Sequence, residues 1–120
     1  MFVRFALVVF FMGMGLFGLV RPRALVGIFG GDAPTAASRS EVRAVYGGFG
    51  LAVAACLATI DRWPLAARAG AYQCLAIGIG GMALGRVFGA CVERDRRAFP
   101  TWVFVGVELC LAAALTWLGR

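Results

Sequence analysis

The chain has 120 residues, 62% of them apolar, with a mean hydropathy of +0.87. A soluble domain carries about 45–50% apolar residues, so this composition excludes that class and indicates an integral membrane protein. The net charge of +6 comes from twelve arginines, without a lysine, against six acids. These arginines stand singly or in short groups between apolar runs, as residues flanking membrane spans do, so we expect a lipid bilayer as partner and no nucleic acid.

Histidine is absent from the sequence. This excludes a histidine-ligated haem or zinc ion and a Ser-His or Cys-His catalytic pair. Four cysteines lie in or beside apolar runs without a C-x-x-C spacing, and we interpret them as small hydrophobic residues. We therefore predict no cofactor, no metal and no catalytic residue. The cysteines are Cys56, Cys74, Cys91 and Cys110.

The first span is predicted at about residues 2–20, because residues 5–20 are an uncharged apolar run. About 20 such residues cross a hydrocarbon core. A cleaved signal peptide is the alternative, but no small-x-small cleavage site follows, so we expect the span to be retained. The proline of Arg21-Pro22-Arg23 should end this helix.

A short apolar segment follows at residues 24–31, too short to cross the bilayer, and we expect it at the interface or against the bundle. The second span is predicted at about residues 41–60. Ser38 or Ser40 should cap its helix, with Glu41 in the first turn, where the helix dipole favours an acid.

The third span is predicted at about residues 65–92 and the fourth at about 101–118, joined by a charged loop at 93–97. The connections after the first loop are short, which favours antiparallel neighbours. We therefore predict an all-α fold, a single membrane domain over residues 1–120 built as an antiparallel four-helix bundle.

Three glycines of the third span, Gly81, Gly85 and Gly89, recur every four residues and share one helix face. Such a face allows close helix approach in membranes. We favour packing inside the bundle over a dimerisation surface.

Arginines distribute unevenly between the two membrane faces. The face that holds the loops after spans one and three has seven and the other face has four, with Arg86 inside a span. By the positive-inside rule, we expect these two loops in the cytoplasm of a multi-pass inner-membrane protein.

Arg86 and Glu108 are the charges that lie deepest in predicted spans, each eleven residues from Arg97. At 1.5 Å per residue, a hairpin places them at similar depth. A lone arginine near mid-membrane costs about 2.5–3.5 kcal/mol on insertion scales, so we predict an Arg86–Glu108 ion pair.

The start of the second span groups Arg43, Tyr46, Gly47 and Gly50 on one helix face, where the glycines would leave room beside the tyrosine hydroxyl. This face could form an intramembrane pocket with Glu41 or Arg43 at its rim and Tyr46, Arg86 and Glu108 deeper in the bundle. The alternative is an internal ion-pair network that fixes helix packing and binds nothing.

Four features carry a family resemblance: the segment from Pro22 to Gly30, the Ser40–Gly48 stretch (SEVRAVYGG), Gly85-Arg86 and Glu108. In these the chain resembles a bacterial domain-of-unknown-function family of four-span membrane proteins, itself similar to the DoxX-like group. The resemblance covers nearly the whole chain. It implies a four-helix membrane fold with a shared polar site and brings no established activity.

Three functions follow as hypotheses. The first is a non-enzymatic accessory or assembly subunit of a larger membrane complex, or a homo-oligomer, suggested by the small size and the glycine-rich third span. The second is a small transporter or a lipid- or metabolite-binding protein that uses the Arg/Glu/Tyr pocket. The third is a quinone- or thiol-linked membrane oxidoreductase component.

Overall fold

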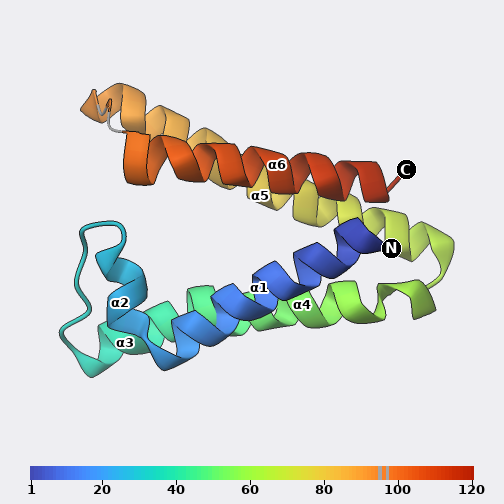
Figure 1. Ribbon diagram of the computed structural model, residues 1–120, viewed down its shortest axis with the longest axis horizontal. Helices are drawn as coiled ribbons and strands as arrows, with labels where there is room; N and C mark the ends of the chain where they lie inside the picture. Colours follow the sequence, from blue (N-terminus) through green and yellow to red (C-terminus); the bar gives the residue numbers. More distant parts are fainter. Residues whose placement is uncertain (95, 97) are drawn as a thin grey trace. The chain divides into compact units, whose positions relative to one another are not determined.

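The computed structural model describes residues 1–94, 96 and 98–120, and every regular element in these residues is helical. The described chain contains four segments long and apolar enough to cross a membrane, which confirms the all-α fold: Phe2–Val20, Ala36–Arg62, Leu65–Glu93 and Ala98–Leu118. The chain divides into two units, Met1–Ile60 and Asp61–Arg120. Each unit is an antiparallel pair of long helices (Figure 1). The assembly of the two pairs into one bundle stays a prediction.

Helix α1 (Phe2–Val20) ends where the proline predicted it to end. The amide of Arg21 bonds the carbonyl of Phe17 at 2.8 Å, and Pro22 then opens α2 (Pro22–Gly27). A proline is well tolerated at a first helical position because that amide has no intrahelical partner. The short apolar segment is thus a six-residue helix with a turn that ends at Gly30, whose φ is +76°.

The second long helix begins at α3 (Ala36–Val42), earlier than predicted, because Thr35 caps it. Thr35 Oγ1 accepts a hydrogen bond from the Ser38 amide at 3.0 Å, and Ser38 Oγ accepts one from the Thr35 amide at 3.1 Å. This reciprocal pair is a capping box. The prediction that Ser38 or Ser40 is the cap is therefore wrong, and Glu41 lies in the second turn rather than the first.

The same helix continues through η1 (Arg43–Gly48), α4 (Phe49–Thr59) and η2 (Ile60–Arg62). Segment η1 is a π-helical turn in which the amide of Phe49 bonds the carbonyl of Ala44, five residues earlier. A π turn takes one residue more than an α turn, so it changes the helical register at the polar start of this span.

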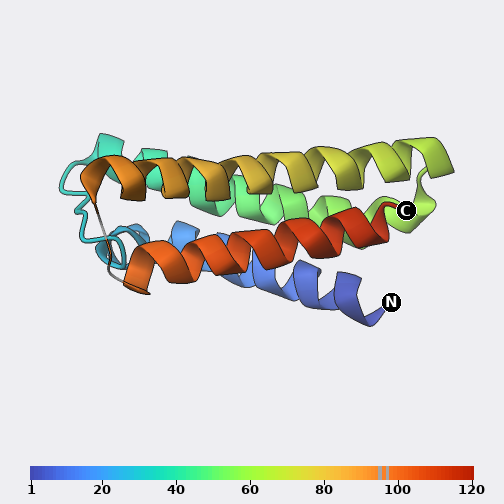
Figure 2. The same cartoon turned by 90° about the horizontal axis from the view of Figure 1, so that it is seen from above.

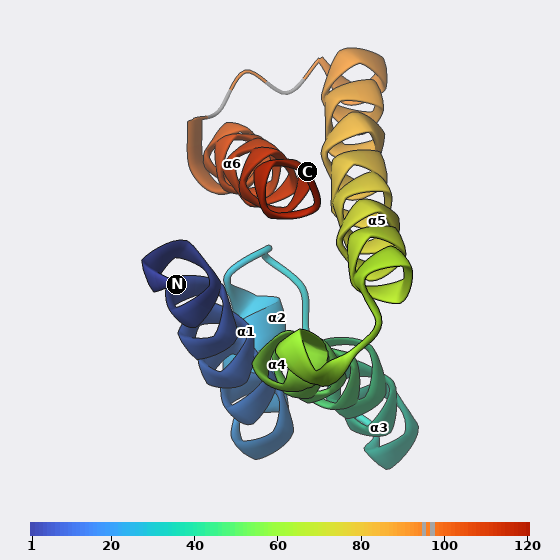
Figure 3. The same ribbon diagram turned by 90° about the vertical axis from the view of Figure 1, so that its right-hand side faces the viewer.

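Glycines bring α1 into backbone contact with η1 and α4, which lie side by side with it in Figure 3. A Cβ on Gly15 would lie 2.8 Å from the Leu51 amide nitrogen, and one on Gly50 would lie 3.0 Å from the Gly15 Cα. A Cβ on Gly18 would lie 2.9 Å from the Gly47 nitrogen. The helices of the first unit therefore approach as closely as small residues in membrane helices allow.

The second unit pairs α5 (Leu65–Glu93) with α6 (Val103–Leu118), which follows the short η3 (Ala98–Trp102) (Figure 2). The predicted charged loop includes residues 95 and 97, which lie outside the described residues. The buried residues of α5 recur every three or four positions along one stripe, except near Arg86: Tyr72, Ala76, Ile79, Ala83 and Ala90. A Cβ on Gly119 would lie 2.9 Å from the Tyr72 Cβ, so the end of α6 packs on the start of α5.

The glycine motif of α5 does not contribute to this pairing. No atom of α6 lies within 4 Å of the position that a Cβ would take on Gly81, Gly85 or Gly89. The buried stripe through Ala83 and Ala90 lies on another side of the helix, so α6 does not cover these glycines. Their packing inside the four-helix bundle stays a prediction.

We expect Gly15→Ala to lower the thermal stability of the protein in mild detergent by about 1–3 kcal/mol, the usual cost of overpacking. The added methyl group would meet backbone atoms of η1 and α4, which cannot rotate away. Gly13→Ala is the matched control in the same helix, since open space surrounds Gly13. Equal melting temperatures for the two variants would contradict the close approach.

Candidate functional site

Arg43 links the start of the second span to the end of the first. Its Nε donates a hydrogen bond to the Leu19 carbonyl oxygen at 3.0 Å. Leu19 lies in the last turn of α1, whose final carbonyls have no intrahelical donors and carry the negative end of the helix dipole. The guanidinium therefore caps α1 from a neighbouring helix.

The rest of the predicted face also lies against α1. Gly47 packs on Leu19 so closely that a Cβ added to this glycine would lie only 2.6 Å from Leu19 Cδ2. The Cβ of Tyr46 lies 3.1 Å from the position that a Cβ would take on Gly18. The backbone and side chains of α1 thus fill the space beside the glycines. The room predicted beside the tyrosine hydroxyl stays a prediction, and Glu41 is exposed on the helix surface.

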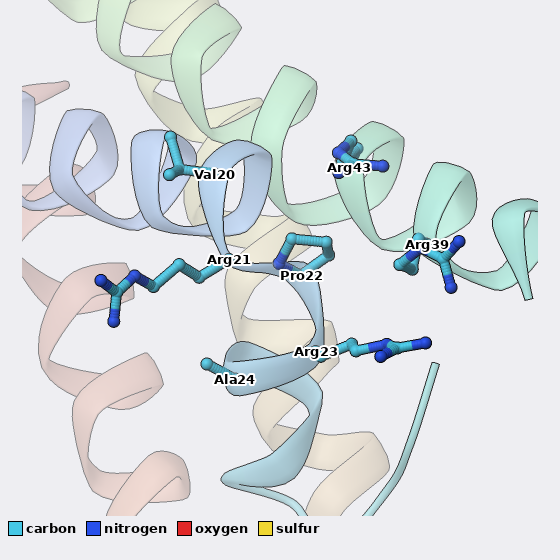
Figure 4. Close-up of a pocket in the computed structure, with 7 residues that line it drawn as sticks. All are labelled: Val20, Arg21, Pro22, Arg23, Ala24, Arg39 and Arg43. Atoms are coloured by element: carbon cyan, nitrogen blue, oxygen red, sulfur yellow. The ribbon is translucent and has the colours of Figure 1, made fainter. Parts of the chain in front are cut away.

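A shallow, open hollow of about 480 Å³ lies where α1 meets α2, next to the polar start of the second long helix (Figure 4). Four of its seven lining residues are arginines. We call these four the arginine cluster: Arg21, Arg23, Arg39 and Arg43. In Figure 4 the side chains of Arg23, Arg39 and Arg43 lie on one side of Pro22, and that of Arg21 extends to the other.

Two members of the arginine cluster share the same two backbone acceptors. Arg23 donates from Nε to the Ala33 carbonyl and from Nη2 to the Pro34 carbonyl, both at 3.2 Å. Arg39 Nη1 donates to the same oxygens, at 3.3 Å for Ala33 and 2.6 Å for Pro34. The loop between α2 and α3 therefore holds two positive charges close together.

Within the part of the chain that the structure describes, the arginine cluster forms no ion pair. The first unit has two acids, Asp32 and Glu41. Asp32 Oδ1 accepts from the Ala33 amide at 2.7 Å, which fixes the loop. The four guanidiniums are therefore not neutralised by contact with a carboxylate of the described chain.

The predicted Arg86–Glu108 ion pair is present in the second unit. Arg86 Nε lies 2.8 Å from Glu108 Oε1, joining the last third of α5 to α6. The exposed fraction of the side chain is 23% for Arg86 and 7% for Glu108. The guanidinium carbon of Arg86 also lies 5.4 Å from the centre of the Phe104 ring, within the range of a cation–π interaction.

One oxygen of this pair is unsatisfied. Glu108 Oε2 is buried and has no hydrogen-bond partner among the described residues. A buried acceptor without a donor costs about 1–3 kcal/mol, so the ion pair is an incomplete polar network. Such a network is compatible with a packing role as well as with a ligand that supplies a donor.

The predicted pocket residues belong to different units. Glu41, Arg43 and Tyr46 lie in the first unit, whereas Arg86 and Glu108 lie in the second. Each polar group is described within its own helix pair, and the shared pocket stays a prediction. The sequence analysis does not assign Arg21, Arg23 and Arg39 to a site. It counts them only among the arginines that predict a cytoplasmic loop by the positive-inside rule.

The residues relevant to redox or metal chemistry are dispersed. All four cysteines are free thiols, and Cys56 is the least exposed of them. Among the described residues, no group of three or more cysteines and acids could hold a metal ion. The polar chemistry of the described chain thus resides in the arginine cluster and in the Arg86–Glu108 pair.

Four apolar helices of spanning length with two small polar groups define a multi-pass membrane protein. The chain belongs to the family of the domain of unknown function DUF4345, whose family model matches residues 2–119. No curated protein and no solved structure matches the chain. The similarity to the DoxX-like group and a bacterial origin stay predictions.

We expect Arg86→Leu to lower the free energy of unfolding in detergent by about 3–5 kcal/mol, because it leaves the buried Glu108 carboxylate without its cation. Glu108→Leu should cost less, since the Arg86 side chain is more exposed and keeps its contact with Phe104. The double variant with leucine at both positions should recover to within about 1 kcal/mol of the parent. Additive losses in this double-mutant cycle, measured by thermal unfolding, would show that the pair is not energetically coupled.

Proposed function

We propose that this membrane protein binds an anionic ligand at the arginine cluster and acts as a binding or transport component rather than as an enzyme. The observation that carries the proposal is that four arginines line one hollow without a carboxylate of the described chain in contact. Guanidinium groups present several fixed donors, and their hydrogen bonds to anions are about twice as strong as bonds between neutral groups.

The hydrogen bonds of the arginine cluster leave donors for a ligand. Arg43 has one hydrogen bond to the described chain, through Nε, and Arg39 donates to it through Nη1 alone. Their remaining nitrogens make no hydrogen bond to the described chain. An anion in the hollow could accept from these groups without disrupting the cap on α1 or the contacts of the loop.

The position of the hollow supports binding at a membrane surface. It begins at Val20, the last residue of the first span, where an apolar helix reaches the headgroup region. The excess of arginines on this side favours the cytoplasmic face of an inner membrane. An anion could therefore enter from the cytoplasm or from the lipid leaflet.

We expect multivalent anions to raise the melting temperature of the detergent-solubilised protein at constant ionic strength. A ligand at ten times its dissociation constant stabilises the folded state by about 1.4 kcal/mol. Arg39→Gln combined with Arg43→Gln should remove most of this shift. Arg62→Gln, which changes an exposed arginine outside the hollow, should leave it intact. Equal shifts in all three proteins would contradict a specific anion site.

A second proposal is an accessory subunit or homo-oligomer that uses the glycine face of α5. It is supported by the open space beside Gly81, Gly85 and Gly89, which α6 leaves uncovered. Glycine faces allow helices to associate closely in lipid.

We expect Gly85→Leu to weaken oligomerisation or copurification of a stoichiometric partner from native membranes, because the side chain would keep a neighbouring helix away. Gly80→Leu is the matched control, since Gly80 also has open space but lies well round the helix from Gly85. Size-exclusion chromatography with light scattering would measure the assembly. A monomer without a partner for the parent protein would contradict this proposal.

A further inference from the structure

We propose that the anion bound by the arginine cluster is a phosphate ester, held by Arg23 and Arg39 with Arg43 beside them. This inference rests on the proposed function and adds the chemistry of the ligand. It starts from the two carbonyl oxygens, of Ala33 and Pro34, that Arg23 and Arg39 both use as acceptors.

The shared acceptors create a local excess of charge. The guanidinium groups of Arg23 and Arg39 are both positive and repel each other. The carbonyl oxygens of Ala33 and Pro34 carry no net charge and offset this repulsion only in part. No carboxylate of the described chain forms an ion pair with either group. A divalent or bridging anion at this point would accept hydrogen bonds from both arginines and remove the repulsion.

The arrangement is fixed before any ligand arrives. Ala33 is 1% exposed, and the side chain of Asp32 holds its amide. The capping box of Thr35 and Ser38 fixes the start of α3, and thereby the position of Arg39. Because these contacts hold the backbone around both guanidiniums, a ligand would meet donors that need little further ordering.

The geometry of the donors fits a tetrahedral oxyanion such as phosphate. A guanidinium offers a planar fork of N–H groups that matches the oxygens of a phosphate, and several forks can converge on one tetrahedral group. Arg43 lies on the same side of Pro22 as Arg23 and Arg39 (Figure 4). Arg23 and Arg39, which share two acceptors, can therefore present their forks to one phosphate, and Arg43 lines the same hollow.

A phosphate could reach the hollow from two sources. Basic groups just beyond a membrane span bind the phosphates of anionic lipids. Val20, at the edge of the hollow, is 73% exposed, as a residue beside lipid would be. A water-soluble phosphate ester offers the same oxygens from the aqueous side. The same arginine donors would recognise either phosphate, so an experiment has to distinguish the lipid source from the soluble one.

The test measures binding to the full-length protein in two arms. In the lipid arm, the protein is placed in phosphatidylcholine nanodiscs, and phosphatidic acid or phosphatidylglycerol is added in steps. In the soluble arm, detergent-solubilised protein is titrated with glycerol 3-phosphate, inorganic phosphate or sulfate at constant ionic strength. Thermal unfolding is recorded at each step, with the parent, R23Q/R39Q, R23K/R39K and R62Q compared.

We expect a phosphate-dependent shift in at least one arm, with R23Q/R39Q weakening the apparent affinity about tenfold or more and R62Q leaving it unchanged. R23K/R39K keeps both charges but loses the planar forks, so its apparent affinity for phosphate should lie between those of the parent and R23Q/R39Q. It also keeps the test decisive if the glutamine variant fails to fold. A shift confined to one arm identifies the source of the phosphate.

Two outcomes overturn the inference separately from the proposed function. Shifts with inorganic phosphate or sulfate, but none with glycerol 3-phosphate or anionic lipid, would leave an anion site but remove the assignment to phosphate esters. No shift with any anion or lipid would remove both. A phosphate response that persists in R23Q/R39Q would place the ligand elsewhere and overturn the role of these two arginines.

Discussion

Charged groups within the apolar layer of a membrane need partners from the protein itself, because lipid supplies no hydrogen bonds there. In the second unit Arg86, in the last third of α5, and Glu108 of α6 meet this requirement in part, with Arg86 Nε 2.8 Å from Glu108 Oε1. Apolar contacts along such helices are similar in many registers. A shift of one helix by a single turn, about 5.4 Å, would separate the two charges, so the ion pair specifies one alignment.

The first unit obtains its alignment in another way. Its long helices meet through backbone atoms at Gly15, Gly18, Gly47 and Gly50, and Arg43 then caps the end of α1. Here a change of register would place side chains against the opposite backbone and remove the cap. The two helix pairs therefore have the same antiparallel arrangement but different interactions that fix it: close van der Waals contact in one and a buried charge pair in the other.

The sequence predicts the spans and the ion pair well, because both follow from hydropathy and from equal distances along a hairpin. The sequence does not decide between neighbouring residues that can each cap a helix, and Thr35 rather than a serine caps the second one. It also gives no sign of the π turn, because that turn needs no particular composition. Glycine spacing does not show which face a neighbouring helix covers. Within its pair α6 leaves Gly85 open, and the spacing gives no sign of the close contact at the buried Gly15.

The arginine cluster is the hardest feature to predict, since the positive-inside rule already accounts for arginines in this loop. That rule requires charge on one side of the membrane, but it does not require two guanidiniums to converge on the same carbonyl oxygens. Arginines that only flank a span could separate into water and avoid their mutual repulsion. The loop instead holds Arg23 and Arg39 together, near Arg43 and without a carboxylate of the described chain in contact. This convergence, rather than the net charge, is the observation on which the proposed anion site rests.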